Sequence, residues 1–316
     1  MASSRTYRRE IPSGARISRW QAPRGWMLRV FDWPTDEHVR ARGSILFQTG
    51  RGDVFEKYLE LFAHWHDAGW RITAFDWRGQ GGSGRLTDDP HCGHIDDFAT
   101  YITDLAAFWD YWRDDADAPL VVMGHSMGGH LVLRALAERA IRPDAAVLIA
   151  PMLGLKTPFG ARASEFLAKL LGGVGNSARP AWRGNEKPNT TQTRQDLLTH
   201  DVERYEDELF WQQQKPELIT GPPSWQWLIE AFRSCRELRS SPAIRKMDVP
   251  VLMLVAQADG LVDPKAALAI GAELPDARIV RFGYESAHEI LREEDPVRNR
   301  AIGEIDLFLA ARAKRD

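Results

Sequence analysis

The chain has 316 residues, 44% of them hydrophobic, and a formal net charge of −3 at pH 7. This length suits one α/β domain of about 220 to 250 residues that carries a large insertion. Because acidic and basic residues are interspersed, the composition excludes a basic stripe for nucleic acid and an acidic disordered tail.

The cysteines and the N-terminal segment indicate the cellular compartment in which the protein is expected. Cys92 and Cys235 are far apart and show neither a disulfide framework nor metal-ligand spacing. Residues 1–14 are basic and polar and lack the apolar core of a signal peptide, and no segment reaches the roughly 18 consecutive apolar residues of a membrane span. We therefore expect a cytoplasmic protein.

Strand-like and helix-like segments alternate along most of the chain. Short runs of bulky residues bounded by Gly, Pro or Asp predict strands at 19–22, 26–33, 44–48, 72–76, 120–123, 145–150, 251–256 and 278–282. Apolar residues at helical spacing predict helices at 55–65, 98–108 and 296–313. This order predicts an α/β fold: a mostly parallel central sheet, built from right-handed crossovers and flanked by helices on both faces.

The alternation breaks once, between Pro151 and about Met247. No strand is predicted there, and a stretch rich in Gly, Pro, Asn and Thr, 172–193, is predicted to be irregular. Helices are predicted at 162–171, 202–214 and 225–238. We expect residues 153–241 to form an inserted, mainly helical cap over the carboxyl ends of the strands, and residues 1–152 and 242–316 to form the core.

The predicted cap is rich in aromatic residues. Its tryptophans are candidate substrate-binding residues, although aromatic side chains also dominate ordinary packing between a cap and a core. We expect one or two of them to face the substrate. The candidates are Trp182, Trp211, Trp225 and Trp227.

The motif Gly124-His125-Ser126-Met127-Gly128 lies between the strand predicted at 120–123 and a helical apolar stripe. Strand, GxSxG and helix together form the context of a nucleophile elbow, in which a sharp turn lifts the serine hydroxyl above the end of the sheet. We predict that Ser126 is the nucleophile.

A serine hydroxyl needs a base that takes its proton and a carboxylate that orients the base. In folds with this elbow, the acid and then the histidine follow the serine in the chain, on loops after later strands. Of nine histidines, His288 alone lies beyond the strand at 251–256, directly after the last predicted strand. His288 is therefore the predicted base.

Two carboxylates, Asp259 and Asp263, are candidates for the acid. Asp263 precedes Pro264 and an apolar run, which places its side chain to cap a helix. Asp259 is left free, three residues past the strand, and its separation from His288 matches one crossover unit. We predict that Asp259 is the acid.

An oxyanion hole needs two backbone N–H groups, one after the nucleophile and one from the loop after an earlier strand. Met127 is the predicted source of the first. The second is expected from 48–52, where glycines allow close approach, and we assign it to Arg51. A plain strand-to-helix turn is the alternative for this loop.

Several motifs together resemble the α/β-hydrolase group that contains monoacylglycerol lipases and bacterial lysophospholipases. The resemblance covers most of residues 43–312. It rests on Thr49-Gly50-Arg51-Gly52 with Tyr58, on Phe75-Asp76-Trp77-Arg78-Gly79-Gln80-Gly81, on the GHSMGG elbow, on Ala150-Pro151-Met152, on Ala258-Asp259 and on Ala287-His288-Glu289.

The resemblance implies a serine hydrolase that cleaves a carboxylic ester of a lipid, a lysophospholipid or a monoacylglycerol, through an acyl-enzyme. It implies Ser126, Asp259 and His288 as triad, and no metal or organic cofactor. A peripheral contact of the cap with a membrane surface stays open from the sequence. One departure is Thr49-Gly50 where the family usually has His-Gly, so a side chain that often braces this loop is missing.

Two alternatives stay open from the residues. The first is a peptidase or small-ester hydrolase of the same fold, because fold and triad do not fix the substrate. An aminopeptidase needs an acidic clamp for the substrate amine, and Glu186 or the run 201–208 are candidates for it. The second is a non-catalytic binding module, which is disfavoured because all three triad positions hold competent residues.

Overall fold

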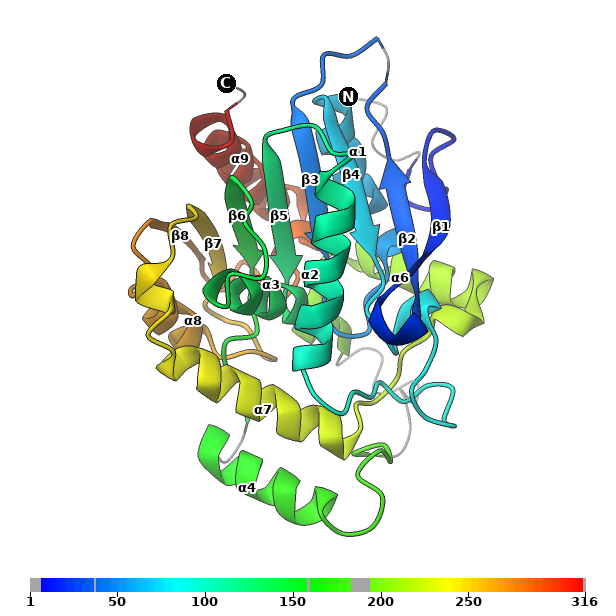
Figure 1. Ribbon diagram of the computed structural model, residues 1–316, viewed down its shortest axis with the longest axis vertical. Coiled ribbons are helices and arrows are strands. Elements are labelled where there is room, and N and C mark those ends of the chain that lie inside the picture. Colours follow the sequence, from blue (N-terminus) through cyan, green and yellow to red (C-terminus); the bar gives the residue numbers. More distant parts are fainter. Residues whose placement is uncertain (1–6, 37, 158–159, 183–193, 315–316) are drawn as a thin grey trace.

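The computed structural model describes residues 7–36, 38–157, 160–182 and 194–314. Its centre is an eight-stranded sheet in the order β1-β2-β4-β3-β5-β6-β7-β8 (Figure 1). The strands are β1 Arg16–Gln21, β2 Met27–Trp33, β3 Gly43–Gln48, β4 Trp70–Phe75, β5 Leu120–His125, β6 Ala145–Ile149, β7 Val251–Ala256 and β8 Ala277–Phe282. Only the β1–β2 and β2–β4 pairs are antiparallel. The predicted mostly parallel sheet is confirmed.

Helices cover both faces of this sheet. Side chains alternate between the two faces along a strand, so Val122 of β5 lies in one core while Val121 and Met123 lie in the other. The first core is closed by α2 (Ala99–Arg113), α3 (Met127–Ala137) and α8 (Pro264–Gly271), and the second by α1 (Leu59–Asp67) and α9 (Asp295–Arg312). Burial on both faces explains why the central strands are unbroken hydrophobic runs.

The long segment between β6 and β7 forms helices and loops, and its described residues add no strand to the sheet. Its longer helices include α4 (Ala161–Gly172), α6 (Val202–Gln214) and α7 (Trp225–Ser240), each within two residues of the predicted range. In Figure 1 the β5 arrow points toward α7, and α4 packs on the outer side of α7. No helix in the described ranges is long and apolar enough to cross a bilayer.

Candidate active site

Ser126 lies at the tight turn between β5 and α3. Its backbone angles, φ 52° and ψ −116°, are ones that residues other than glycine rarely adopt. The turn is sterically possible because a neighbouring residue lacks a side chain: a Cβ on Gly124 would lie 2.7 Å from the backbone of Gly128. The Ser126 N–H donates to the carbonyl of Ile149 in β6 over 2.9 Å, which fixes the turn at the end of the sheet.

His288 and Asp259 lie in the loops that follow β8 and β7, and both are buried. Nδ1 of His288 is 2.6 Å from Oδ2 of Asp259. The other carboxylate oxygen accepts the backbone N–H groups of Leu261, at 2.8 Å, and Val262, at 3.0 Å. With Nδ1–H directed at the carboxylate, Nε2 of His288 is left to accept a proton.

Burial opposes the charged form of each partner, but their mutual attraction prevails. Burial alone would raise the pKa of Asp259 and lower that of His288. The opposite charge and the hydrogen bond reverse both effects, so the pKa of Asp259 lies below its ordinary value and that of His288 above it. Asp259 is therefore ionised at neutral pH and stabilises a protonated His288.

Asp263 has a different place in the structure. It is the N-cap residue of α8, and its Oδ1 accepts the backbone N–H of Lys265 at 2.9 Å. Pro264 occupies the first helical position, where no N–H is needed. The helix-cap interpretation of Asp263 is confirmed, and the carboxylate that contacts His288 is Asp259.

The loop after β3 lies directly against the elbow. A Cβ on Gly50 would be 3.3 Å from the Cβ of Ser126, so the loop backbone and the serine are in close contact. The N–H of Gly50 donates to Oδ2 of Asp53 at 3.2 Å. By contrast, the N–H groups of Arg51 and Met127 have no backbone or side-chain acceptor among the described residues. These are the two donors predicted for an oxyanion.

The bracing of this loop differs from the pattern expected for the family. In place of a histidine side chain, three contacts hold the loop. Nε1–H of Trp77 donates to the carbonyl of Thr49 over 3.0 Å, and the N–H of Gly52 donates to Oε1 of Gln80 over 2.6 Å. Together with the contact between Gly50 and Asp53, they fix the loop backbone without the missing histidine.

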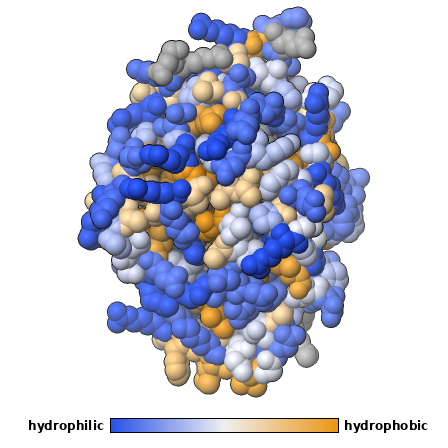
Figure 2. All heavy atoms as spheres, viewed as in Figure 1, coloured by the Kyte–Doolittle hydropathy of each residue, from blue (hydrophilic) through white to orange (hydrophobic). Residues whose placement is uncertain are grey.

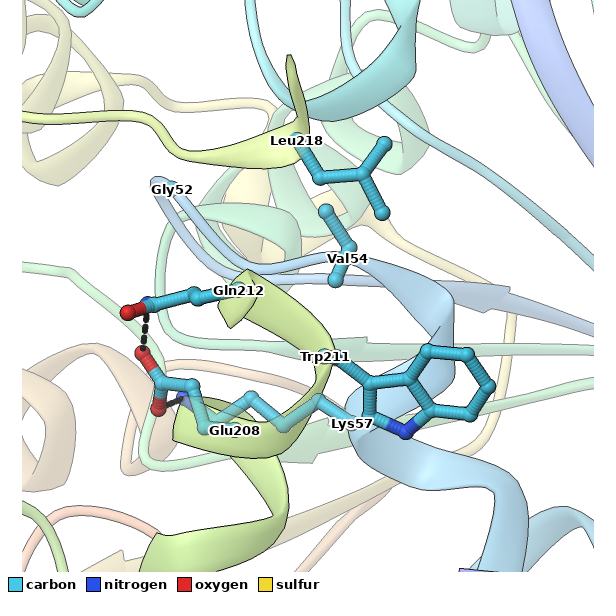
Figure 3. Close-up of a pocket in the computed structure, with 7 residues that line it drawn as sticks. All are labelled: Gly52, Val54, Lys57, Glu208, Trp211, Gln212 and Leu218. Carbon is cyan, nitrogen blue, oxygen red and sulfur yellow. Dashed lines mark hydrogen bonds and ion pairs between the residues drawn. The ribbon is translucent and has the colours of Figure 1, made fainter. Parts of the chain in front are cut away.

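Lys57 is a buried cation at the junction of core and inserted segment. Its Nζ lies 2.7 Å from Asp53 in the same loop, 2.9 Å from Glu208 of α6 and 2.5 Å from Glu289, the neighbour of His288. Figure 3 shows the Lys57 side chain reaching Glu208, which in turn accepts a hydrogen bond from Gln212. Burial lowers the pKa of Lys57, but the three carboxylates outweigh it and raise the pKa.

A second set of buried polar groups continues from this cluster to the elbow. The hydroxyl of Tyr58 donates to Oδ2 of Asp53 over 2.7 Å and lies 2.9 Å from Nδ1 of His125. Nε2 of His125 lies 3.4 Å from the carbonyl oxygen of His288. These contacts could not be read from the sequence, because Glu289 is far in the chain from Lys57 and His125 is far from Tyr58.

A cavity of about 660 Å³ has Ser126 and His288 in its wall. Most of the wall is apolar, with charged groups at Arg51, Asp53, Arg194 and Glu289. The apolar lining comes largely from the segment between β6 and β7. It includes Met152, Leu155, Trp182, Leu197, Leu198, Pro222, Pro223, Trp227, Leu228, Leu261 and Val262.

Residues 39–295 match the model of the serine aminopeptidase S33 family. The chain belongs to this family. Over 280 residues it is 30% identical to lysophospholipase L2 of Escherichia coli K12, covering 82% of this chain and 78% of that protein. It is 26% identical to the monoglyceride lipase of Rattus norvegicus over 234 residues, covering 70% and 72% of the two chains.

Solved structures agree with the fold. A soluble variant of the Saccharomyces cerevisiae monoglyceride lipase, in complex with a substrate analog, superposes with a TM-score of 0.75. The match covers 95% of this chain and 97% of that one at 19% identity. The central sheet with its inserted segment is thus the α/β-hydrolase fold of the S33 family.

In this S33 family member, the four candidate tryptophans are not all at the cavity. Trp182 and Trp227 line it. Trp211 instead lines a separate small pocket with Val54 and Leu218 (Figure 3), and its Nε1–H donates to the carbonyl of Arg8 over 3.0 Å. Trp225 packs against α4: a Cβ built on Gly172 of α4 would lie 3.1 Å from the Cβ of Trp225.

Those acids proposed for an amine clamp that the structure describes do not supply a free carboxylate at the cavity. Glu186 lies outside the described residues. Within the run 201–208, Asp201 caps α6, and Glu208 pairs with Lys57 and with Arg194 at 2.7 Å. The carboxylates that line the described cavity wall, Asp53 and Glu289, are both bound to Lys57.

Proposed function

We propose that this chain is a serine hydrolase that cleaves carboxylic esters of lipids through a covalent acyl-enzyme. One observation carries the proposal. Ser126, at a strained elbow, and His288, bonded to the ionised Asp259, share one large cavity with a mainly apolar wall. An apolar wall suits an acyl chain, because each buried methylene contributes about 0.8 kcal/mol.

In the proposed mechanism, Oγ of Ser126 attacks the ester carbonyl while Nε2 of His288 takes its proton. Asp259 stabilises the imidazolium that forms. The N–H groups of Arg51 and Met127, which have no acceptor among the described residues, donate to the developing oxyanion. His288 then returns the proton to the leaving alcohol, and a water molecule activated by the same base releases the fatty acid.

Lipid ester hydrolysis is preferred over peptide hydrolysis, even though the family is named for an aminopeptidase. The names of two relatives, lysophospholipase L2 and monoglyceride lipase, denote lipid esterases. The described carboxylates of the cavity wall, Asp53 and Glu289, are paired with the two cations Lys57 and Arg292, so they leave no free negative charge for a substrate amine. Both points favour a lipid ester.

We further propose that residues 153–241 act as a cap on a core formed by residues 1–152 and 242–316. The helices α4, α6 and α7 fall in this segment, and its residues supply most of the apolar cavity wall. In this arrangement the core carries the catalytic groups, and the cap binds the acyl chain and sets the preference for its length.

The outer face of α4 supports a peripheral contact of this cap with a membrane. Phe166 and Leu170 of α4 are 68% and 57% exposed, and Val174, just after the helix, is 69% exposed. Figure 2 shows hydrophobic atoms at the end of the molecule where α4 lies in Figure 1. The proposed setting is the cytoplasmic membrane surface, since both cysteines are free and buried, as suits a reducing compartment.

A substrate panel tests the proposal. The full-length protein would be assayed on lysophospholipids, monoacylglycerols, short nitrophenyl esters and aminoacyl amides. We expect kcat/KM on the lipid esters to exceed that on the amides and to rise with acyl length. A protein that cleaves the amides and not the lipid esters would be a peptidase, and one without length dependence would be a small-ester hydrolase.

A further inference from the structure

Arg51 places a cation in the wall of the cavity that contains Ser126. Its backbone adjoins the elbow, and its guanidinium reaches along the wall toward the segment before α7. There Nη1–H donates to the carbonyl of Gly221 over 2.8 Å, and the guanidinium carbon lies 5.6 Å from the centre of the Trp227 ring. These contacts fix the direction of the side chain.

The charge of Arg51 is not balanced by an ion pair. Among the described residues no carboxylate lies within ion-pair distance of its guanidinium, whereas the neighbouring Asp53 is bound to Lys57. Burial and then the positive charge of Arg194 lower the pKa of Arg51 to about 10. A guanidinium has five N–H donors, and the carbonyl of Gly221 accepts from one nitrogen. The remaining donors are available to an anion in the cavity.

We propose that Arg51, together with Arg194, binds the phosphate of a glycerophospholipid substrate, so that this site prefers a lysophospholipid over a neutral monoacylglycerol. The inference rests on the proposed function and names the substrate class of the same site. In a lysophospholipid the phosphate is separated from the ester only by the glycerol backbone. A cation one side chain away from the predicted oxyanion donor therefore suits that phosphate while the ester lies at Ser126.

Guanidinium groups suit this task, because their forked donors match two phosphate oxygens, whereas an ammonium group acts as a point charge. Arg194 belongs to the inserted segment and also pairs with Glu208 of α6. Phosphate binding between Arg51 and Arg194 would thus join the loop after β3 to the segment that forms the acyl wall.

The experiment compares two substrates with the same acyl chain, a decanoyl lysophosphatidylglycerol and monodecanoylglycerol, both below their critical micelle concentrations. The measured quantity is the ratio of their kcat/KM values in the full-length protein. Charge-assisted hydrogen bonds lead us to expect that Arg51→Met lowers this ratio roughly 10- to 100-fold. Arg51→Lys should restore part of the ratio, because the charge remains without the fork.

Arg245→Met is the matched control, since it removes an exposed surface cation that pairs with Glu273. It should leave the ratio unchanged. If Arg51 only anchors Gly221, Arg51→Met will slow both substrates equally, and the proposal is then wrong. Inorganic phosphate could also inhibit the wild type as strongly as glycerol phosphate does, while Arg51→Met leaves the ratio of kcat/KM values unchanged. That result would indicate a site for free phosphate and would also contradict the proposal. Failure of the wild type to cleave either lipid would instead refute the proposed function.

Discussion

Nζ of Lys57 lies 2.5 Å from Oε1 of Glu289, the residue directly after His288. The same ammonium group is 2.9 Å from Glu208 of α6, so one buried cation connects the proposed base loop to the proposed cap. Arg292 adds a second cation, with Nη1 2.5 Å from Glu289. The position of His288 thus depends on charges contributed by segments that are far apart in the chain.

Replacement of Lys57 by methionine should be strongly destabilising. It would leave Asp53, Glu208 and Glu289 buried without their shared cation, and breaking a buried pair in this way costs about 3–5 kcal/mol. The measurement is the free energy of unfolding from urea denaturation. Lys265→Met, at an exposed position on α8, is the control. A loss below about 1 kcal/mol in Lys57→Met would mean that the cluster does not hold the site together.

The two aspartates after β7 should respond differently to the same change. Asp259→Asn should reduce kcat by roughly 10³ to 10⁴, because the histidine loses the group that sets its tautomer. Asp263→Asn should stay within a few-fold in activity and within about 1 kcal/mol in stability, because asparagine caps helices nearly as well. Steady-state kinetics on a nitrophenyl ester and thermal unfolding measure both. The reverse pattern would exchange the two roles.

The pH profile should carry the signature of the pair formed by His288 and Asp259. His288 must be neutral to accept a proton, so activity is lost as the pH falls through its pKa. Since Asp259 raises that pKa above its ordinary value of about 6.5, the acid limb of kcat/KM should have its midpoint above that pH. In Asp259→Asn the residual activity should show a limb at lower pH. A limb that stays in place in this variant would show that another group controls it.

The exposed face of α4 should contribute to membrane binding. Phe166→Glu combined with Leu170→Glu should lower the partition of the protein onto phospholipid vesicles roughly 10-fold or more, because each apolar side chain contributes about 1.5–3 kcal/mol when buried. Co-sedimentation with the vesicles measures this. Leu307→Glu, at a 63% exposed leucine of α9, is the control. Equal partition of all three proteins would rule out α4 as the contact.

Local patterns in the sequence were sufficient to predict the sheet, the helices of the insertion and the role of Asp263 as the N-cap residue of a helix. The reason is that period, turn residues and chain order are encoded within short segments. The cavity wall was only partly predictable. Trp225 and Trp227 lie two positions apart on α7 and point to different neighbours, and periodicity does not say which side faces a cavity.

Contacts between distant segments were not predictable. The cluster around Lys57 draws on Glu208 and Glu289, whose proximity depends on how α6 packs against the loop after β3. The position of the Arg51 side chain was also not predictable. The backbone N–H of Arg51 was assigned from the glycines beside it, but the direction of its guanidinium, which has no ion-pair partner among the described residues, depends on contacts with Gly221 and Trp227.

The proposed mechanism depends most directly on Ser126 as the group that attacks a lipid ester. The decisive measurement is the rate of oleate release from an oleoyl lysophospholipid by the wild-type protein and by Ser126→Ala at equal concentration. We expect the wild type to release oleate and the variant to lose at least about 10⁴-fold of that rate, since loss of a nucleophilic serine leaves only the residual effects of binding and the oxyanion donors. Oleate release by Ser126→Ala at more than about one-tenth of the wild-type rate would contradict the account.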